Sequence, residues 1–479
     1  MNVMQTIKES YFYHLWTIIA GWFSVQWNKS WIVDRFSSQK SGLEQAEASV
    51  FHRIAVALRK WLLWIFEKLH LTKLLRGSIF CVPALWSGLT VVLTPFLPTM
   101  ASLALVLVSL GSLLLVFGRE RERKLVYFPV NKFIYAFAFI FMYATFTSVT
   151  LRGSFFVGLI TVMFTIFAIV LMNAVTTWSQ VRAICGFSVL AGVGVSLYGL
   201  YQWLNPQKFT SVWTDTDLFT TFEFRVYSTF ANPNVLGEYF LLVLPLAAAL
   251  VLTSKSWLAR IFWLGCGGVT MLCLLLTYSR GCYLGILFAI ALFLVLLDRR
   301  FILLGIVGLA LAPMILPASI MERFLSIGNM KDTSTSYRWF IYMGSLAMLK
   351  DYWFSGVGPG IDAFNEVYPV YAYHAVTAPH SHNLFLQLTS DTGIFGLIAF
   401  CLIVFSFYRT CFTALRGEKS FEARVFIITG ISAISGFMVQ SMTDYTFYNY
   451  RVMLLFWATL ALGFLFTRYR QLKGAERRG

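Results

Sequence analysis

The chain of 479 residues is dominated by apolar segments of about membrane length, separated by polar connections. A bilayer core about 30 Å thick is crossed by an α-helix of about 20 predominantly apolar residues. The pattern therefore predicts an all-α polytopic membrane protein with about twelve transmembrane helices. Because several connections are very short, ten or eleven spans remain an alternative, with one pair forming a long tilted or re-entrant helix. The predicted spans are 78–97, 100–117, 131–149, 153–175, 181–203, 233–252, 257–277, 281–297, 300–317, 383–408, 422–443 and 449–467.

The composition agrees with this pattern. Hydrophobic residues make up 58% of the chain and charged residues only 13%, whereas soluble domains carry roughly 25% charged residues. A water-soluble enzyme is therefore excluded. The seven cysteines include no C-x-x-C pair, so we predict neither a disulfide framework nor a zinc site.

The excess of positive charge follows from membrane topology. There are 38 Lys+Arg against 22 Asp+Glu, which gives a formal net charge of +16. Cytoplasmic loops of membrane proteins collect Lys and Arg. If residues 1–77 lie inside, only nine of the 38 cationic residues fall on the outer side. Both chain ends are therefore predicted to be cytoplasmic, and no nucleic-acid partner is expected.

The predicted organisation begins with a membrane-surface region, 1–77, which contains aromatic, basic, amphipathic stretches that suit an anionic leaflet. A further span is the alternative for the stretch 50–75. The long extracytoplasmic loop includes a predicted short helix, Tyr337 to Tyr352, that lies on the surface like a lid. After the first region come transmembrane helices 1–9 (78–317), the extracytoplasmic loop (318–382), transmembrane helices 10–12 (383–467) and a basic cytoplasmic tail (468–479).

Three of the six histidines fall between 374 and 382, directly before an apolar span. His382 is therefore predicted at the outer mouth of that helix. A neutral imidazole there is suited to accept a proton from an acceptor hydroxyl, or to orient that hydroxyl. Helix capping and metal binding are the alternatives. His380 and His382 alone supply fewer than the three or four ligands of a usual metal site, so we predict no metal and no other cofactor.

Three arginines, Arg225, Arg280 and Arg338, lie on the predicted outer side, where the topology rule disfavours cations. Each alone is also explained by a side chain that snorkels to the interface. Together with His382 they predict a group of cationic donors on one side of the membrane. Guanidinium groups bind phosphates bidentately, so a diphosphate is the expected ligand. Stabilising a diphosphate leaving group would replace the metal ion that phosphate chemistry often uses.

The acidic residues give weaker signals. Asp215 and Asp217 form a D-x-D pair, but a metal-nucleotide site is disfavoured because nucleotide sugars are cytoplasmic, whereas this loop is predicted on the extracytoplasmic side. Asp391 and Asp444 lie within or near spans, where pairing with an arginine is expected. The sequence contains no Walker A or G-x-S-x-G motif, so neither ATP-driven transport nor serine-hydrolase chemistry is predicted.

One spacing resembles a known family. His382-Asn383, nine residues and Gly393-Ile-Phe-Gly396 are similar to the H-[NSQ]-x9-G-x-x-G signature of the O-antigen ligase and O-antigen polymerase superfamily. The resemblance covers roughly 205–467. Further matching features are the Ser279-Arg280-Gly281 turn, Arg225 before Asn232-Pro-Asn234, and Tyr337-Arg338-Trp339 before the Gly356-Val-Gly358-Pro-Gly360 turn.

This resemblance implies a GT-C-like fold with an extracytoplasmic loop before the histidine. It also implies a metal-independent glycosyltransferase of the bacterial inner membrane. Such an enzyme moves a glycan from an undecaprenyl-diphosphate carrier to an acceptor hydroxyl at the outer face, with inversion if displacement is in line. The implied partners are the lipid-linked glycan donor, a glycan or lipid acceptor, and membrane lipids. By this analogy His382 is the essential histidine, Arg225, Arg280 and Arg338 bind the donor diphosphate, and His380 and Asn383 have supporting roles.

The N-terminal extension also resembles a subgroup of the same superfamily that is named after a putative cyanobacterial bicarbonate transporter. Anion transport is therefore the alternative function, since arginines bind bicarbonate as well as phosphate. A transport path is expected to show polar groups in several spans or broken helices at the midplane. The candidate residues here gather instead at the outer mouth, which favours glycan transfer.

Overall fold

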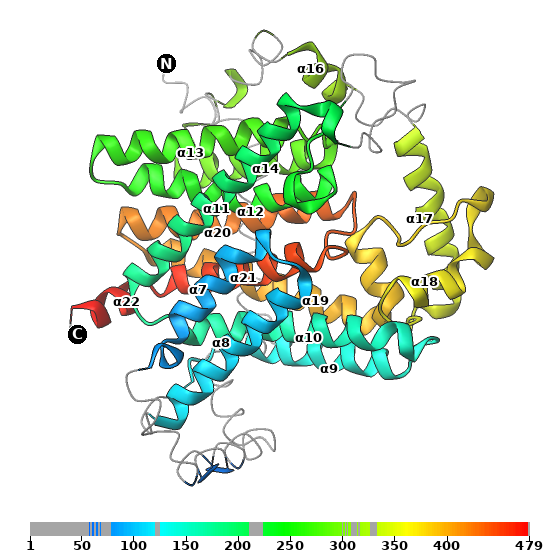
Figure 1. Cartoon of the computed structure of the whole chain (residues 1–479), viewed down its shortest axis with the longest axis horizontal. Coiled ribbons are helices and arrows are strands. Elements are labelled where there is room, and N and C mark those ends of the chain that lie inside the picture. Colours follow the sequence, from blue (N-terminus) through cyan, green and yellow to red (C-terminus); the bar gives the residue numbers. More distant parts are fainter. Residues whose placement is uncertain are drawn as a thin grey trace, which may run out of the picture.

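The computed structural model is a bundle of helices that run roughly side by side (Figure 1). It describes residues 57, 60, 61, 64, 65, 68, 78–119, 125–209, 224–298, 300, 301, 303, 305–307, 314, 317–325 and 333–477. Throughout these residues the regular elements are helices, so the predicted all-α polytopic membrane fold is confirmed. The α-helices are α7 (Pro83–Leu93), α8 (Thr99–Arg119), α9 (Asn131–Phe146), α10 (Leu151–Ala174), α11 (Trp178–Leu204), α12 (Pro233–Thr253), α13 (Trp257–Leu275), α14 (Arg280–Leu297), α16 (Ala318–Leu325), α17 (Thr333–Tyr352), α18 (Ile361–Val367), α19 (Leu384–Gly417), α20 (Phe421–Ser441), α21 (Tyr450–Thr467) and α22 (Tyr469–Glu476).

Eleven of the predicted spans correspond to apolar helices. Within the described residues, nine helices are long and apolar enough to cross a membrane, namely α8, α10 to α14 and α19 to α21. The shorter apolar helices are α9 and the stretch Pro83–Phe96. The twelfth predicted span, 300–317, and the amphipathic region 1–77 lie largely outside the described residues.

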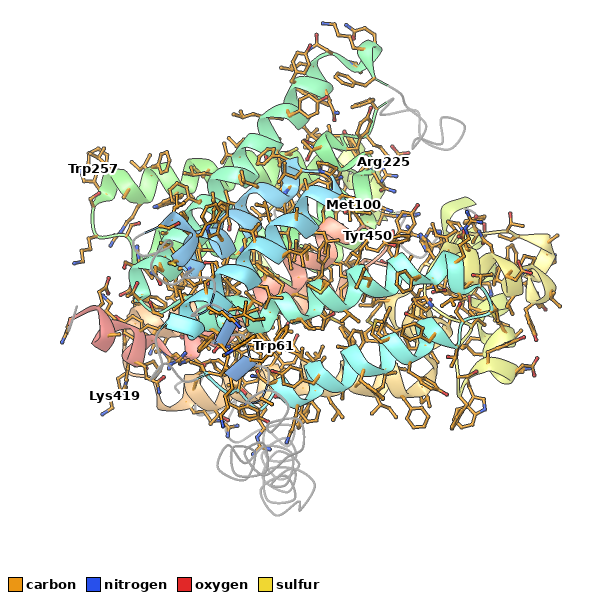
Figure 2. The ribbon with its side chains drawn as sticks, turned by 60° about the horizontal axis from the view of Figure 1, so that its bottom comes forward. Trp61, Met100, Arg225, Trp257, Lys419 and Tyr450 are labelled. Carbon is orange, nitrogen blue, oxygen red and sulfur yellow. The ribbon has the colours of Figure 1, made fainter. Side chains whose placement is uncertain are left out.

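Burial separates central helices from peripheral ones. The most apolar windows of α12 and α21 are each 83% buried in protein, whereas that of α13 is only 22% buried. The exposed side of α13 is apolar, with Trp257 68% and Leu258 63% exposed. Apolar side chains on this scale are expected to face hydrocarbon. Figure 2 shows Trp257 at one extremity of the molecule.

One end of the bundle, which we call the basic end, collects the connections predicted to be cytoplasmic. Arg182 in α11 binds Glu422 in α20 at 2.6 Å and Thr253 at the end of α12 at 3.2 Å. Arg470 in α22 binds Glu418 at 3.1 Å. Figure 2 shows Lys419 at this end and Arg225 far from it.

The opposite end carries a packed unit built from α17, α18 and the short turns that follow them (Figure 1). Its small core is separate from the core of the bundle and includes Ile341, Met348, Phe364 and Tyr368, none of them exposed. Helix α17 covers the range of the short helix predicted from Tyr337 to Tyr352 and begins four residues earlier. Part of the long loop is therefore a packed unit in which α17 contacts α19.

Helix α19 is interrupted at Gly393, which has a left-handed φ of +68°. The loop after α17 fills the break with backbone hydrogen bonds: Val357 N–H donates to the Ser390 carbonyl at 2.7 Å, and Ile394 N–H donates to the Trp353 carbonyl at 2.8 Å. A Cβ atom at Gly393 would collide with the Phe354 carbonyl. The first glycine of the G-x-x-G signature is therefore required by the conformation of this break.

Replacement of Gly393 by Ala is expected to destabilise the protein by about 2–4 kcal/mol, because the new methyl group meets a backbone carbonyl in a left-handed conformation. The apparent melting temperature of the detergent-solubilised protein measures this change. Gly417→Ala on the same helix is the matched control, since a Cβ there meets nothing within 4 Å. Equal melting temperatures for the two variants would contradict the proposed role of the break.

Candidate functional site

His382 lies directly before α19, in a left-handed backbone conformation with φ +49°. Such a conformation is uncommon for a residue other than glycine and is often found at functional sites. The cap of α19 is Asn383, whose side-chain oxygen accepts from Phe385 N–H at 2.9 Å and Leu386 N–H at 3.0 Å. Its amide also donates to the Met442 carbonyl at 2.8 Å. Helix capping therefore belongs to Asn383, and the alternative that assigned it to His382 is wrong.

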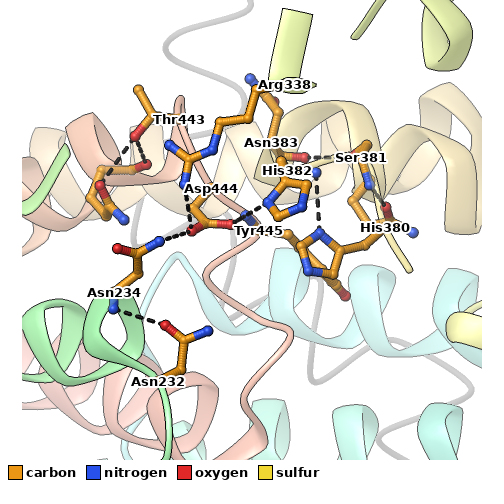
Figure 3. A network of polar contacts seen from close by, with 12 residues as sticks. Asn232, Asn234, Arg338, His380, Ser381, His382, Asn383, Thr443, Asp444 and Tyr445 are labelled. Atoms are coloured by element: carbon orange, nitrogen blue, oxygen red, sulfur yellow. Dashed lines mark hydrogen bonds and ion pairs between the residues drawn. The ribbon is translucent and has the colours of Figure 1, made fainter. Parts of the chain in front are cut away.

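His382 is joined to Asp444, which lies between α20 and α21. The His382 Nδ1 atom is 3.0 Å from one carboxylate oxygen of Asp444. The other oxygen accepts from Asn234 Nδ2 at 3.0 Å and from the Arg338 guanidinium at 3.4 Å (Figure 3). The predicted arginine partner of Asp444 is thus Arg338. Nothing in the local sequence indicated the pairing with His382, because the two residues are 62 positions apart.

The charge state of Asp444 fixes the hydrogen-bonding role of His382. Burial opposes ionisation of Asp444, but Arg338 and His382 together hold the pKa of that carboxyl well below its ordinary value. An ionised carboxylate only accepts hydrogen bonds, so Nδ1 of His382 must donate. In the neutral imidazole, Nε2 then carries the lone pair. This is the arrangement that a general base requires.

Arg225 is connected to the same carboxylate through Asn234. Asn232 caps α12 by accepting from Asn234 N–H at 2.8 Å, and Pro233 occupies the first helical position. This cap places the Asn234 side chain between two charged groups. Its oxygen accepts from the Arg225 guanidinium at 3.0 Å while its nitrogen donates to Asp444. Arg225 is further held by the Thr277 carbonyl at 2.9 Å.

Arg280 begins α14 at the same end of the bundle. The next residue, Gly281, lies so close to the side chains of Gln440 and Thr443 that a Cβ atom would collide with both. Thr443 directly precedes Asp444 in the chain. The structure thus brings Arg338 into contact with the Asp444 carboxylate and joins Arg225 to it through one amide. It places the first turn of α14 against the side chain of Thr443, the residue before Asp444.

His380 positions His382 through a hydrogen bond to its backbone. It is only 6% exposed, and its Nδ1 atom accepts a hydrogen bond from the His382 backbone N–H at 3.1 Å. Burial, and then the proximity of the His382 ring, lower the pKa of His380 from 6.5 to about 3. His380 is therefore neutral near pH 7 and remains an acceptor. The Tyr342 hydroxyl of α17 adds a second support by donating to the His382 carbonyl at 3.0 Å.

The comparison with known protein families agrees with this geometry. Residues 265–401 match the family model described as O-antigen ligase. This segment of the chain is therefore similar to the O-antigen ligase family. The matched segment includes Arg280, Arg338 and His382, whereas Arg225 and Asp444 lie outside it. No curated protein matches the chain at a significant level.

Two more carboxylates, Asp391 in α19 and Glu238 in α12, are buried in the bundle. Asp391 was expected to pair with an arginine, and this expectation is wrong: its oxygens accept from Gln387 Nε2 at 2.8 Å and the Tyr445 hydroxyl at 3.5 Å. Glu238 in α12 accepts from Gln440 Nε2 at 3.2 Å. At Asp391 an amide and a hydroxyl donor take the place of an arginine, whereas the second oxygen of Glu238 has no hydrogen-bond partner among the described residues.

Among the residues that the structure describes, only His380, His382 and Asp444 could together hold a metal ion, because their ligand atoms lie within 4.8 Å of one another. The arrangement does not suit a cation, however. Both oxygens of Asp444 already accept hydrogen bonds, one of them from the positive guanidinium of Arg338. Nδ1 of His380 is also engaged, by the backbone of His382. Arg338 thus supplies the positive charge that a metal ion would bring.

The buried, neutral His380 predicts a pH dependence of stability. Below its ordinary pKa of 6.5 the unfolded chain binds a proton that the folded chain binds only near pH 3, so stability falls as the pH drops through this window. His380→Asn keeps an acceptor for the His382 N–H and removes the titration. Between pH 7 and pH 5 the apparent melting temperature of wild type is expected to fall more than that of the variant, whereas parallel curves would contradict the assignment. This range lies above the ordinary pKa of 3.8 for Asp444.

Divalent cations are expected not to bind at His380, His382 and Asp444. Anything that binds only the folded state raises the melting temperature. Zinc or magnesium added to the purified, chelator-treated protein should therefore shift wild type and Asp444→Asn equally. A shift in wild type that Asp444→Asn abolishes would instead indicate a metal site.

Proposed function

We propose that this protein is a membrane glycosyltransferase of the O-antigen ligase or polymerase type. It transfers a glycan from an undecaprenyl-diphosphate carrier to an acceptor hydroxyl on the extracytoplasmic face of a bacterial inner membrane. The observation that supports this most strongly is the contact of His382 with Asp444, whose second oxygen is bound by Arg338 and Asn234. The match of residues 265–401 to the O-antigen ligase family supports the same reaction class.

The acceptor hydroxyl is activated by His382. In the neutral imidazole, Nε2 takes the hydroxyl proton as the oxygen attacks the anomeric carbon. The bond from that carbon to the diphosphate oxygen breaks at the same time, and the lipid diphosphate leaves with the bonding electrons. Ionised Asp444 stabilises the imidazolium that forms and keeps Nδ1 protonated throughout. An in-line displacement of this kind inverts the anomeric configuration.

The donor diphosphate is bound by the arginines. Among the described contacts, Arg338 uses one terminal nitrogen for Asp444, and the remainder of its planar group is available for a phosphate oxygen. Arg225 is held at the other end of the Asn234 relay, and Arg280 begins α14 beside Thr443. Preorganised guanidinium groups stabilise the negative charge that develops on a leaving diphosphate. This reaction needs no metal ion.

The orientation in the membrane follows from the distribution of charge. The ion-paired connections around Arg182, Glu422 and Arg470 form the basic end. By the positive-inside rule that end is cytoplasmic, and His382 then lies at the outer face. A lipid-linked glycan presented on the outer leaflet reaches the site from the membrane.

The decisive test uses purified protein with a defined lipid-diphosphate glycan and candidate acceptors, with mass spectrometry of the products. His382→Ala is expected to lower the transfer rate by about 10²–10⁴-fold, the usual contribution of a general base. Asp444→Asn is expected to cause a loss of similar order, because the amide removes the charge and can reverse the imidazole tautomer. His374→Ala, an exposed histidine of the same loop, is the matched control and should remain active.

Normal transfer by His382→Ala at an unchanged protein level would contradict the proposal. The alternative function of anion transport predicts a different outcome. In that case the wild-type protein in proteoliposomes would take up labelled bicarbonate and would form no glycan product.

A further inference from the structure

A chain of buried hydrogen bonds runs from the residue before His382 into α19. The Ser381 N–H donates to Gln387 Oε1 at 2.7 Å, and Gln387 Nε2 donates to Asp391 Oδ1 at 2.8 Å. None of the three residues is more than 1% exposed. Gln387 and Asp391 are four positions apart, so they lie on one face of the helix. In the proposed transfer neither side chain touches the reacting atoms.

The same acidic group also reaches the segment that carries Asp444. The Tyr445 hydroxyl donates to Asp391 Oδ2 at 3.5 Å, which is the longer of the two side-chain contacts of Asp391. Tyr445 directly follows Asp444 in the chain (Figure 3). Asp391 is therefore linked through Gln387 to the backbone beside His382. Through Tyr445 it is linked to the backbone beside Asp444.

The backbone around His382 depends on such contacts. His382 has a φ of +49°, and a left-handed conformation outside glycine persists only where the surrounding structure holds it. His380 accepts from the His382 N–H, and Tyr342 donates to the His382 carbonyl. Gln387 accepts from the preceding N–H, that of Ser381. Side chains thus bind this turn at consecutive backbone groups and define the direction in which the imidazole leaves the chain.

Asp391 determines the orientation of the Gln387 amide. A glutamine amide has one acceptor end and one donor end, and the Ser381 N–H requires the acceptor end. Asp391 binds the donor end and so keeps the acceptor end directed at Ser381. An apolar residue at position 391 would leave the donor end buried without this partner, which is unfavourable. The amide would then no longer be fixed.

We infer that Asp391 is a positioning residue for His382 and that it acts through Gln387. It keeps the imidazole in the orientation that contacts Asp444. Hydrogen bonding rather than charge carries the effect, because both contacts of the Asp391 side chain are to neutral groups. The kinetic consequence rests on the proposed function of His382 as a base, whereas the orientation of the imidazole does not.

Steady-state kinetics of glycan transfer by the purified full-length protein test this inference. Asp391→Val is expected to lower kcat about tenfold with little change in KM, because a misplaced base slows the chemical step without weakening substrate binding. Asp391→Asn keeps an acceptor for Gln387 and should retain kcat to within about threefold of wild type. An unchanged kcat in Asp391→Val, or an equal loss in Asp391→Asn, would overturn the inference.

Thr389→Val is the matched control for these variants. It removes a buried hydroxyl of the same helix, which donates to the Phe385 carbonyl at 2.8 Å and does not reach Ser381. Its kcat is expected to equal that of wild type. A loss as large as that in Asp391→Val would show that any buried polar group of this stretch has the same effect, and would contradict a specific role for Asp391.

A double-mutant cycle tests whether Asp391 acts through Gln387. Gln387→Met preserves the length of the side chain and removes both of its hydrogen bonds. The double variant Gln387→Met with Asp391→Val should be no slower than Gln387→Met alone, because residues that act as one unit are not additive. Additive losses in kcat would overturn the route through Gln387.

The nitrogen NMR signals of the His382 ring provide a readout that does not require transfer. In protein with labelled histidine, these signals are assigned by their loss in His382→Asn. Wild type, Asp391→Asn and Thr389→Val are expected to show a protonated Nδ1 and an unprotonated Nε2, whereas Asp391→Val should show an average of the two tautomers. Unchanged signals in Asp391→Val would overturn the inference. If wild type forms no glycan product while the signals change as expected, the proposed function fails and the positioning of His382 by Asp391 stands.

Discussion

The arrangement of the site depends on the need to neutralise one buried carboxylate. Asp444 is 8% exposed, and an isolated charge at such a place would cost several kcal/mol. The structure compensates it with an imidazole, a guanidinium and an amide, each from a different segment of the chain. These contacts draw together the ends of α12, α17, α19 and α20. The same contacts require Nδ1 of His382 to donate to Asp444. The neutralisation of the carboxylate and the proposed role of His382 as a base therefore depend on the same hydrogen bond.

The interruption of α19 is where the loop after α17 binds the helix that follows His382. Residues before the break carry His382 and its cap, and residues after it continue as a long span to the basic end. The loop at 353–358 bonds to backbone groups on both sides of Gly393, through the carbonyls of Ser390 and Asp391 and the N–H of Ile394. The loop that completes the helix is also the continuation of α17. The continuous segment 333–358, made of α17 and the loop after it, thus contacts the residues around His382 and also supplies Arg338, which binds Asp444.

The sequence identified candidate site residues where a residue type was rare for its position. It did not identify contacts between residues that are far apart in the chain. Arg338 and His382 stood out as polar groups on the predicted outer side, and the hydrophobic runs located eleven helices that the structure describes. The link from His382 to Asp444 depends on how α20 and α21 pack, which no local pattern encodes. The break at Gly393 was not predicted: four polar residues, 389–392, directly precede it, but polar side chains alone do not distinguish an interrupted helix from a continuous one. Asp391 shows that a buried acid in a span can be satisfied by neutral donors alone.

The position of Arg338 on α17 has a thermodynamic consequence. When α17 is docked, its guanidinium lowers the energy of ionised Asp444, so the ionised carboxylate must in return strengthen the docking of α17 by the same free energy. An anion that displaced Asp444 from Arg338 would weaken this attachment, whereas an anion bound by the other nitrogens of Arg338 would leave it in place. Protonation of Asp444 and the docking of α17 are therefore coupled through a single ion pair.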